Sequence, residues 1–386
     1  MTLAKAAGSS AAPGWVALAG LALVASVNPF GCGTAPDDDD GLDPGAVKDV
    51  LAAVGPEVVI PTVYGFQTRV DQLEDAIEDW RVAAESGGDT SAARAVAQNA
   101  FAAAMEIWQQ AEVHQIGPAG SSLTAVDGQD LRDEIYSWPT INPCRVDQET
   151  VEGDWDDADF FQVNLVNSYG LDALEHVLFA GPDNACPGQI DINADGTWDA
   201  LGADGLEINR AQFAAALASD VSDRADELLG AWEGGYDKLF AETGQEGLNA
   251  VYDALFYLET ATKDGKLTDL SPEDVEGVEA GDSVERIRAN LVGFKILFTG
   301  GSGQGLDDLL EEVGHGDLAT SILADTDAAI ALTETLANPI DALLVSDPEA
   351  VTGLHDAVKQ ITDAVKGDLA TVLTLQIPSE AAGDAD

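Results

Sequence analysis

The chain has 386 residues and carries 70 acidic and 17 basic side chains, so its formal net charge is −53 at pH 7. This field attracts cations and repels nucleic acids and anionic membrane surfaces, so we expect no nucleic-acid partner. The length allows two domains, and a hydrophobic content of 46% allows a sizeable core. Four His and two Met exclude metal-binding tracts rich in either residue. We ascribe most of the acidic residues to a surface that stays hydrated in saline surroundings.

Residues 1–32 resemble an export signal. Lys5 precedes an apolar run from Trp15 to Val27, which is too short to span a membrane as a mature helix, and Gly31-Cys32 follows it. Cys32 and the acidic residues 33–45 after it resemble a lipoprotein processing site with a flexible tether. We therefore predict a lipid on Cys32 that anchors the exported protein to a membrane.

Pro29 and Phe30 depart from the usual lipoprotein pattern, so cleavage without lipidation is the alternative. Gly33 stands where an Asp can retain lipoproteins at the inner membrane. We expect an anchor in the outer membrane facing the periplasm, or at the cell surface.

The remainder of the chain is predicted to be all-α. Residues 181–205 form its least helical stretch, residues 139–156 are expected to be loop and short turns, and strand signals are nearly absent. We expect two helical-bundle domains, at residues 46–195 and 196–386. Helical patterns cover residues 46–53, 58–86, 90–114, 127–136, 157–179, 206–240, 247–263, 283–298, 306–313, 318–336 and 350–375.

Cys144 and Cys186 remain once Cys32 is set apart. An even pair in an exported chain predicts a disulfide. It would close a loop of about 40 residues and stabilise the fold by roughly 3–4 kcal/mol on the loop-entropy estimate.

The helix that includes residues 170–179 carries an unusual set of polar side chains. Asp172, Glu175 and His176 stand at i, i+3 and i+4 and so share one face, while leucines cover the other. We expect this helix to be buried, and buried carboxylates need a partner. Two carboxylates and one imidazole suit a metal ion; the alternative is a structural ion-pair cluster with a basic residue such as Arg145.

The same stretch resembles the signature helix of the imelysin-like family, whose motif is Gly-x-His-x-x-Glu. Further segments resemble that family in the same order, so that the resemblance extends over residues 48–386. They are Trp108 to Glu112 with Gly117-Pro118, Ser137 to Pro139 with Cys144 to Gln148, Asn249 to Leu258 with Lys266-Leu267, Asn290-Leu291 with Leu297-Phe298 and Gly303 to Leu306, and Leu375 to Pro378.

The resemblance implies two four-helix-bundle-like domains, with the signature helix near their interface, in an exported and often iron-regulated protein. Some relatives act in iron uptake, and one branch has been described as metallopeptidases. Asp172 stands where the motif has His, which favours an oxygen-rich site and leaves His176 to supply an imidazole. The His-Glu-x-x-His element of zinc proteases is absent from the sequence, which argues against peptidase activity.

Glu112 and His114 end the helical pattern that contains Trp108, and the resemblance places this stretch close to the signature helix. We interpret Glu112 as a third carboxylate ligand; the alternative is an exposed pair at a helix end. Trp108 and Trp138 are interpreted as core anchors.

A second candidate site lies at residues 191–199. Asp191, Asn193 and Asp195, with Gly196 in the sixth position, match the start of a calcium loop. The twelfth position is Gly202 rather than Glu, so Asp199 or Asp204 would have to substitute. The alternative is an acidic turn.

We therefore predict an exported, lipid-anchored, imelysin-like protein that binds iron or another divalent metal through Asp172, Glu175, His176 and Glu112. Its role would be iron uptake or capture, with other uptake components as possible partners. The alternatives are a metal-dependent peptidase and a helical protein without metal, whose cluster is structural.

Overall fold

The computed structural model describes residues 42–378, and between them it contains helices and no strand. The all-α prediction is confirmed. The export signal, Cys32 and the acidic stretch 37–40 lie outside the described residues. Residues 42–378 form one compact unit.

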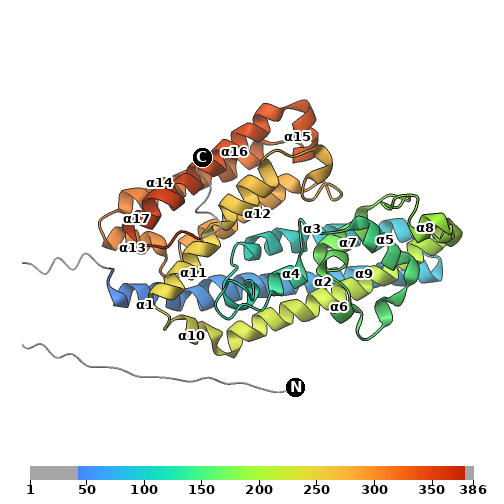
Figure 1. Ribbon diagram of the computed structural model, residues 1–386, viewed down its shortest axis with the longest axis horizontal. Coiled ribbons are helices and arrows are strands. Elements are labelled where there is room, and N and C mark those ends of the chain that lie inside the picture. Colours follow the sequence, from blue (N-terminus) through green and yellow to red (C-terminus); the bar gives the residue numbers. More distant parts are fainter. Residues whose placement is uncertain (1–41, 379–386) are drawn as a thin grey trace, which may run out of the picture. The chain divides into compact units, whose positions relative to one another are not determined.

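Three long helices build the first group. α2 (Ile60–Ser86) packs along both α3 (Thr90–Glu112) and α9 (Thr197–Ala231), and α7 (Gly170–Phe179) packs against α9 and α3 (Figure 1). Each long helix turns its large apolar side chains to the others, so that Phe66, Trp80, Phe101 and Phe213 are fully buried. Asp89 caps the start of α3 by accepting a hydrogen bond from the Ala92 amide at 3.1 Å.

A second group follows α9. α12 (Ser283–Phe298) packs against α3 of the first group and against α14 (Gly316–Thr335), which in turn packs on α16 (Pro348–Ala364) (Figure 1). The division into domains at residues 46–195 and 196–386 stays a prediction.

The remaining elements are short. They are α1 (Pro44–Ala53), α4 (Leu131–Ile135), α5 (Pro143–Glu152), α6 (Phe160–Val163), α8 (Asp191–Ala194), α10 (Asp237–Phe240), α11 (Gln245–Leu255), α13 (Leu306–Glu312), α15 (Ile340–Ser346) and α17 (Ala370–Val372); the π-helical turns η1 (Val54–Val59), η5 (Trp232–Tyr236), η6 (Leu258–Gly265) and η8 (Val365–Leu369); and the 3-10 turns η2 (Gly117–Ala119), η3 (Asp154–Asp156), η4 (Val166–Ser168) and η7 (Pro272–Asp274).

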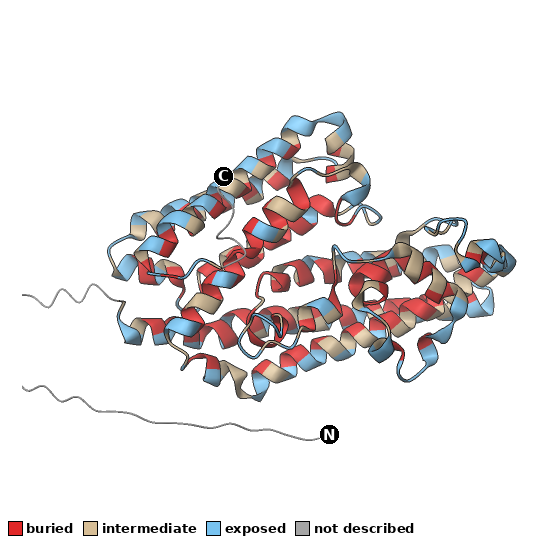
Figure 2. Cartoon of the chain, in the orientation of Figure 1, coloured by how far each residue is buried: buried red, intermediate tan, exposed pale blue. Residues whose placement is uncertain are grey.

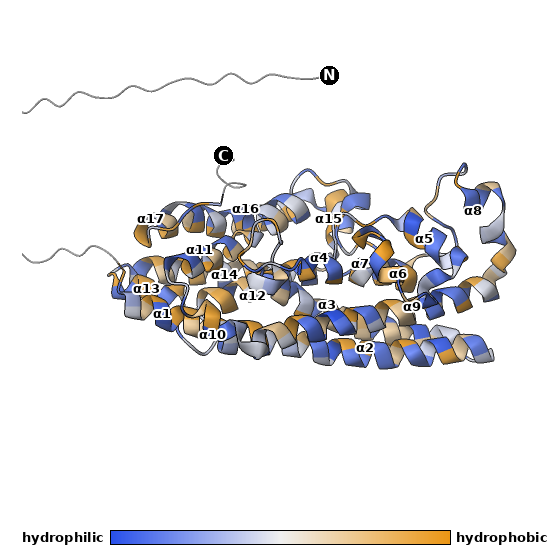
Figure 3. Ribbon diagram, turned by 60° about the horizontal axis from the view of Figure 1, so that its bottom comes forward, coloured by the Kyte–Doolittle hydropathy of each residue, from blue (hydrophilic) through white to orange (hydrophobic). Residues whose placement is uncertain are grey.

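Buried residues line the sides of the helices that face one another, and exposed residues line their outer sides (Figure 2). The hydropathy colouring follows the same division (Figure 3). In the described part of the chain, no single helix is both long and apolar enough to cross a membrane. Taken together, α14 and α15 reach that length and apolarity, but they are bent by 76° relative to each other.

The expected continuous helix over residues 157–179 is wrong. The chain forms α6, then η4, and starts α7 only at Gly170, because Tyr169 is fully extended at φ −142° and Gly170 has φ +87°. A side chain is excluded at Gly170, since its Cβ would lie 2.8 Å from the carbonyl oxygen of Ile135.

The loop expected over residues 139–156 is also wrong, because α5 occupies most of it. Asn142 accepts a hydrogen bond from the Arg145 amide at 3.1 Å, and Pro143 takes the first helical position. The helix expected at 127–136 is reduced to α4, since Asp127 and Asp130 both have positive φ. α15 was not expected.

Candidate functional site

The signature helix α7 is buried on all sides, as expected. Its polar side chains Asp172, Glu175 and His176 are 6%, 7% and 6% exposed. Neighbouring helices therefore meet the polar face as well as the leucine face. Each of the three polar side chains has a defined partner.

Glu175 forms an ion pair with Arg286 of α12. Nη2 of Arg286 donates to Oε2 of Glu175 at 2.7 Å, and the Ala280 amide donates to the other oxygen at 3.2 Å. Arg286 also donates to Asp282 at 2.7 Å and to the Tyr136 hydroxyl at 3.0 Å. The guanidinium is 1% exposed and therefore depends on these acceptors.

Asp172 faces a hydroxyl rather than a basic group. The Ser137 hydroxyl donates to Oδ2 at 2.7 Å, and the Ala173 amide donates to Oδ1 at 3.0 Å. Burial raises the pKa of Asp172 to about 7, and these two hydrogen bonds oppose the rise only in part. Asp172 therefore exchanges a proton near neutral pH.

His176 lies between two carboxylates from different segments. Nδ1 is 2.8 Å from Oε1 of Glu279, and Nε2 is 3.1 Å from Oδ1 of Asp147 in α5. Burial alone lowers the pKa of His176, but the hydrogen bonds to Asp147 and Glu279 raise it to about 9. The ring is thus a cation at neutral pH and donates from both nitrogens.

Glu112, at the end of α3, is paired with Arg132 of α4. Nε and Nη2 of Arg132 donate to Oε1 at 3.0 and 2.5 Å, and Nζ of Lys266 lies 3.9 Å from Oε2. His114 is 1% exposed and donates from Nε2 to the Gly293 carbonyl at 3.0 Å. Burial lowers the pKa of His114 to about 4. The alternative of an exposed pair at the helix end is therefore wrong, since both side chains are buried.

A further cluster surrounds Lys266, whose Nζ lies 2.9 Å from Oε2 of Glu276 and donates to Gln109 at 2.7 Å and to Asn290 at 2.8 Å. The Tyr136 hydroxyl donates to Glu276 at 2.7 Å and joins this cluster to Arg286. We call these paired groups the charged cluster. Its members are Glu112, Arg132, Tyr136, Asp147, Asp172, Glu175, His176, Lys266, Glu276, Glu279, Asp282 and Arg286.

The partners in the charged cluster were missed by sequence analysis. Arg145, the basic residue considered, pairs instead with Glu149 and, at 3.1 Å, with Glu152 on its own helix. The only available signal was scarcity, since the chain has 17 basic residues against 70 acidic ones. Scarcity does not indicate which basic residue reaches which acid.

Comparison with known proteins decides the family. The sequence profile of imelysin matches residues 66–366, which is most of the chain. The chain belongs to the imelysin family. The resemblance found in the sequence is thereby confirmed.

Two solved structures share the imelysin fold with this chain. An imelysin-like protein from Psychrobacter arcticum 273-4 has a TM-score of 0.67 and 17% identity, covering 88% of this chain and 99% of its own. A protein described as an iron-regulated protein A precursor from Parabacteroides distasonis ATCC 8503 has a TM-score of 0.64 and 15% identity, covering 87% of this chain and 97% of its own. No curated protein sequence matches the chain.

The expected metal ligands of this chain do not fit a metal ion as they lie. Glu175 and Glu112 are bound to arginines, and His176 is protonated between two carboxylates. Among residues 42–378, no group of three or more His, Cys, Asp or Glu side chains is placed to hold a metal. The arrangement is that of an internal ion-pair cluster.

The expected calcium loop does not form at residues 191–199. Asp191 to Ala194 make up α8, and Asp199 lies in the first turn of α9. The Asn193 side chain donates to the Cys186 carbonyl at 2.8 Å and exchanges hydrogen bonds with Asn184. The Asn193 side chain thus ties α8 to the segment at residues 184–187.

The predicted disulfide is confirmed. Cys144 and Cys186 are bonded, with Cα atoms 4.5 Å apart. The bridge ties the first turn of α5 to the segment after α7. Close by, the Ala185 amide donates to Oδ2 of Asp147 at 2.6 Å, so the cross-link holds one of the two partners of His176 in place.

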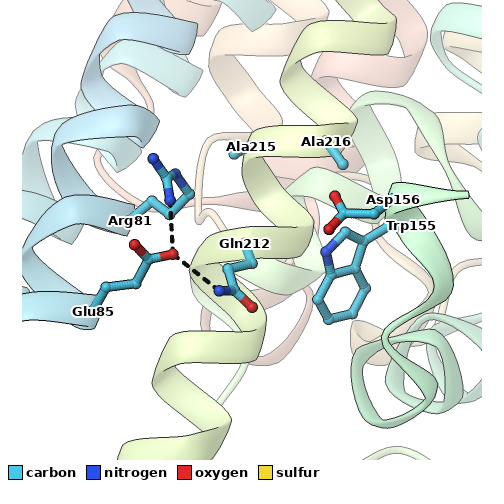
Figure 4. Close-up of a pocket in the computed structure, with 7 residues that line it drawn as sticks. All are labelled: Arg81, Glu85, Trp155, Asp156, Gln212, Ala215 and Ala216. Atoms are coloured by element: carbon cyan, nitrogen blue, oxygen red, sulfur yellow. Dashed lines mark hydrogen bonds and ion pairs between the residues drawn. The ribbon is translucent and has the colours of Figure 1, made fainter.

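A surface cavity of about 240 Å³ lies between α2, η3 and α9 and contains none of the predicted site residues. Figure 4 shows its walls. Glu85 accepts hydrogen bonds from Arg81 at 2.7 Å and from Gln212 at 2.9 Å, and so closes one side, opposite Trp155 and Asp156. The polar groups on that side already satisfy one another.

Proposed function

We propose that this member of the imelysin family is an exported, lipid-anchored protein of iron uptake that acts by binding rather than by catalysis. Family membership and the name of the Parabacteroides protein, an iron-regulated protein A precursor, support the link to iron and export. The membrane anchor rests on Cys32, as predicted from the sequence.

The arrangement of the charged cluster supports the non-catalytic part of the proposal. A metallopeptidase needs a metal held by protein ligands beside an open coordination position for water or substrate. Here Asp172 and Glu175 are buried, and Glu175 already forms an ion pair with Arg286 at 2.7 Å. That pairing is the observation that carries the non-catalytic part of the proposal, and it supports a role for the cluster in holding the helices together.

Metal binding at the signature helix is the second candidate. Asp172 favours it, because this buried carboxyl has no basic partner and holds its proton only up to about pH 7. A bound cation would replace that proton, so affinity would fall as the pH drops. Iron or another divalent metal would be the occupant.

Metal analysis of the full-length protein, purified without chelator, separates the two candidates. Wild type and Glu175→Gln are compared for iron, zinc, manganese and calcium content and for unfolding by urea. If the cluster is structural, the two proteins have equal metal content and Glu175→Gln is less stable. A loss of bound metal in Glu175→Gln would instead establish the signature helix as the metal site.

The role in iron uptake is tested in cells. A deletion strain should take up labelled iron more slowly under iron limitation, and the wild-type gene should restore uptake. A Cys32→Ser gene should restore less, because the protein would lose its anchor. Unchanged uptake in the deletion strain would refute the role. Peptide cleavage by the wild type, abolished in Glu175→Gln, would replace the proposal with the peptidase alternative.

A further inference from the structure

Five residues cover the end of α7 that carries Glu175 and His176. They are residues 277–281, Gly-Val-Glu-Ala-Gly, between η7 and α12. Only two hydrogen bonds join them to α7. The Ala280 amide donates to Glu175 at 3.2 Å, and Glu279 accepts from Nδ1 of His176 at 2.8 Å.

Both ends of this segment are glycines with left-handed backbone conformation. Gly277 and Gly281 each have φ +72°. The Gly281 amide donates to the Gly277 carbonyl at 2.7 Å and closes the segment into one turn. A closed turn between two permissive residues can rotate as a unit, because the φ changes are confined to its ends.

The flanking residues are held far more firmly than the turn. On one side Glu276 is 2% exposed and bound to Lys266 and Tyr136. On the other side Asp282 accepts from Arg286 at 2.7 Å, just before α12 begins. Within the turn, the Glu279 side chain is 32% exposed and Val278 is 37% exposed.

We propose that residues 277–281 form a hinged flap, with the Glu279–His176 pair as its latch, which opens to admit solvent and small solutes to Glu175 and His176. Glu276 and α12 stay in place during this motion. The proposal does not depend on a role in iron uptake, because it concerns access to the signature helix and not what binds there. It predicts that local opening of this segment is easier than opening of α7 or α12.

Hydrogen exchange read by mass spectrometry tests the flap in the full-length protein. Glu279→Ala removes the latch, and Glu273→Ala is the matched control, since it removes an exposed carboxylate from the same connection outside the flap. We expect amide exchange at residues 278–281 to accelerate about tenfold in Glu279→Ala, the effect of losing one partly exposed charge-assisted hydrogen bond. Glu273→Ala should exchange like the wild type.

Solvent access to His176 is measured by exchange of its ring C2 hydrogen, followed over a range of pH. Because this exchange proceeds through the protonated ring, the rates of the proteins are compared at equal fractions of protonated His176. This exchange should also accelerate in Glu279→Ala, while that of buried His114 stays unchanged. Equal rates at residues 278–281 and at His176 in all three proteins would overturn the flap. An equal acceleration in α12 or at His114 would overturn it too, because the segment would then open only together with the rest of the fold.

Discussion

Two interiors of the molecule exclude water equally but are filled by different kinds of side chain. One lies between α2, α3 and α9, and the other surrounds α7. The first is filled by side chains such as Phe66, Trp80 and Phe101, each fully buried. The second contains Arg286 and Lys266 at about the same depth. Apolar contacts are not directional, and the stabilisation of each apolar side chain is the sum of many weak contacts. A buried charge depends on one or two particular partners. Loss of one partner should therefore harm the charged cluster more than its small contact area suggests.

Arg286→Met should have the largest effect. It leaves Glu175 and Asp282 buried without their cation, which should destabilise the fold by about 3–5 kcal/mol, measured by urea unfolding. Arg288→Met on the same helix is the control and should change stability by less than about 1 kcal/mol, because this side chain is partly exposed. Equal effects for the two substitutions would mean that the charged cluster does not hold the fold.

The apolar interior was largely predictable from the sequence, and the charged cluster was not. The helical spacing of Phe101, Met105 and Trp108 indicates a buried face from neighbouring positions alone, and α12 spans the predicted residues 283–298. Glu175 and Arg286 are 111 positions apart, and Gln109 and Lys266 are 157 apart. No local pattern specifies such pairs, because they arise only when the helices pack.

Removal of the disulfide tests whether the interior around α7 opens independently of the interior between α2, α3 and α9. Replacing Cys144 and Cys186 by Ser should cost about 3–4 kcal/mol through the loop entropy of the unfolded chain. Hydrogen exchange should rise in α5 and in the segment after α7, where Asp147 and Ala185 are held, but not in α2. An equal rise in α2 would show that the two regions unfold as one and are not independent.

Asp172→Asn should raise stability in a pH-dependent way. The pKa of Asp172 is about 7 in the folded chain against an ordinary value of 3.8, so the unfolded state releases its proton first as the pH rises. The stability of the wild type therefore falls between about pH 4 and pH 7. The variant should not lose stability in this range, because Asn keeps the shape of the side chain and cannot ionise. The variant should equal the wild type at pH 4 and exceed it by about 4 kcal/mol at pH 8. Thermal unfolding at both pH values measures the difference, and a lower stability of the variant at pH 8 would show that the Asp172 carboxylate is needed in its charged form.

Removal of the exposed ion pair between Lys48 and Glu242 should have the smallest effect on stability. Its coupling energy is the reference for that of the buried pair. Its atoms are 2.6 Å apart, but the side chains are 55% and 67% exposed, so water and salt screen the attraction. Lys48→Met also removes a positive charge and makes the net charge more negative than −53, which weakens the fold through general repulsion. A double-mutant cycle with Glu242→Gln cancels that background and isolates the pair, whose coupling energy should be below about 1 kcal/mol and should vanish in about 1 M salt. The same cycle on Glu175 and Arg286 should give a larger coupling energy that salt barely changes, because that pair is buried. If the exposed pair proved the stronger of the two, burial would not be what distinguishes the charged cluster from the acidic surface.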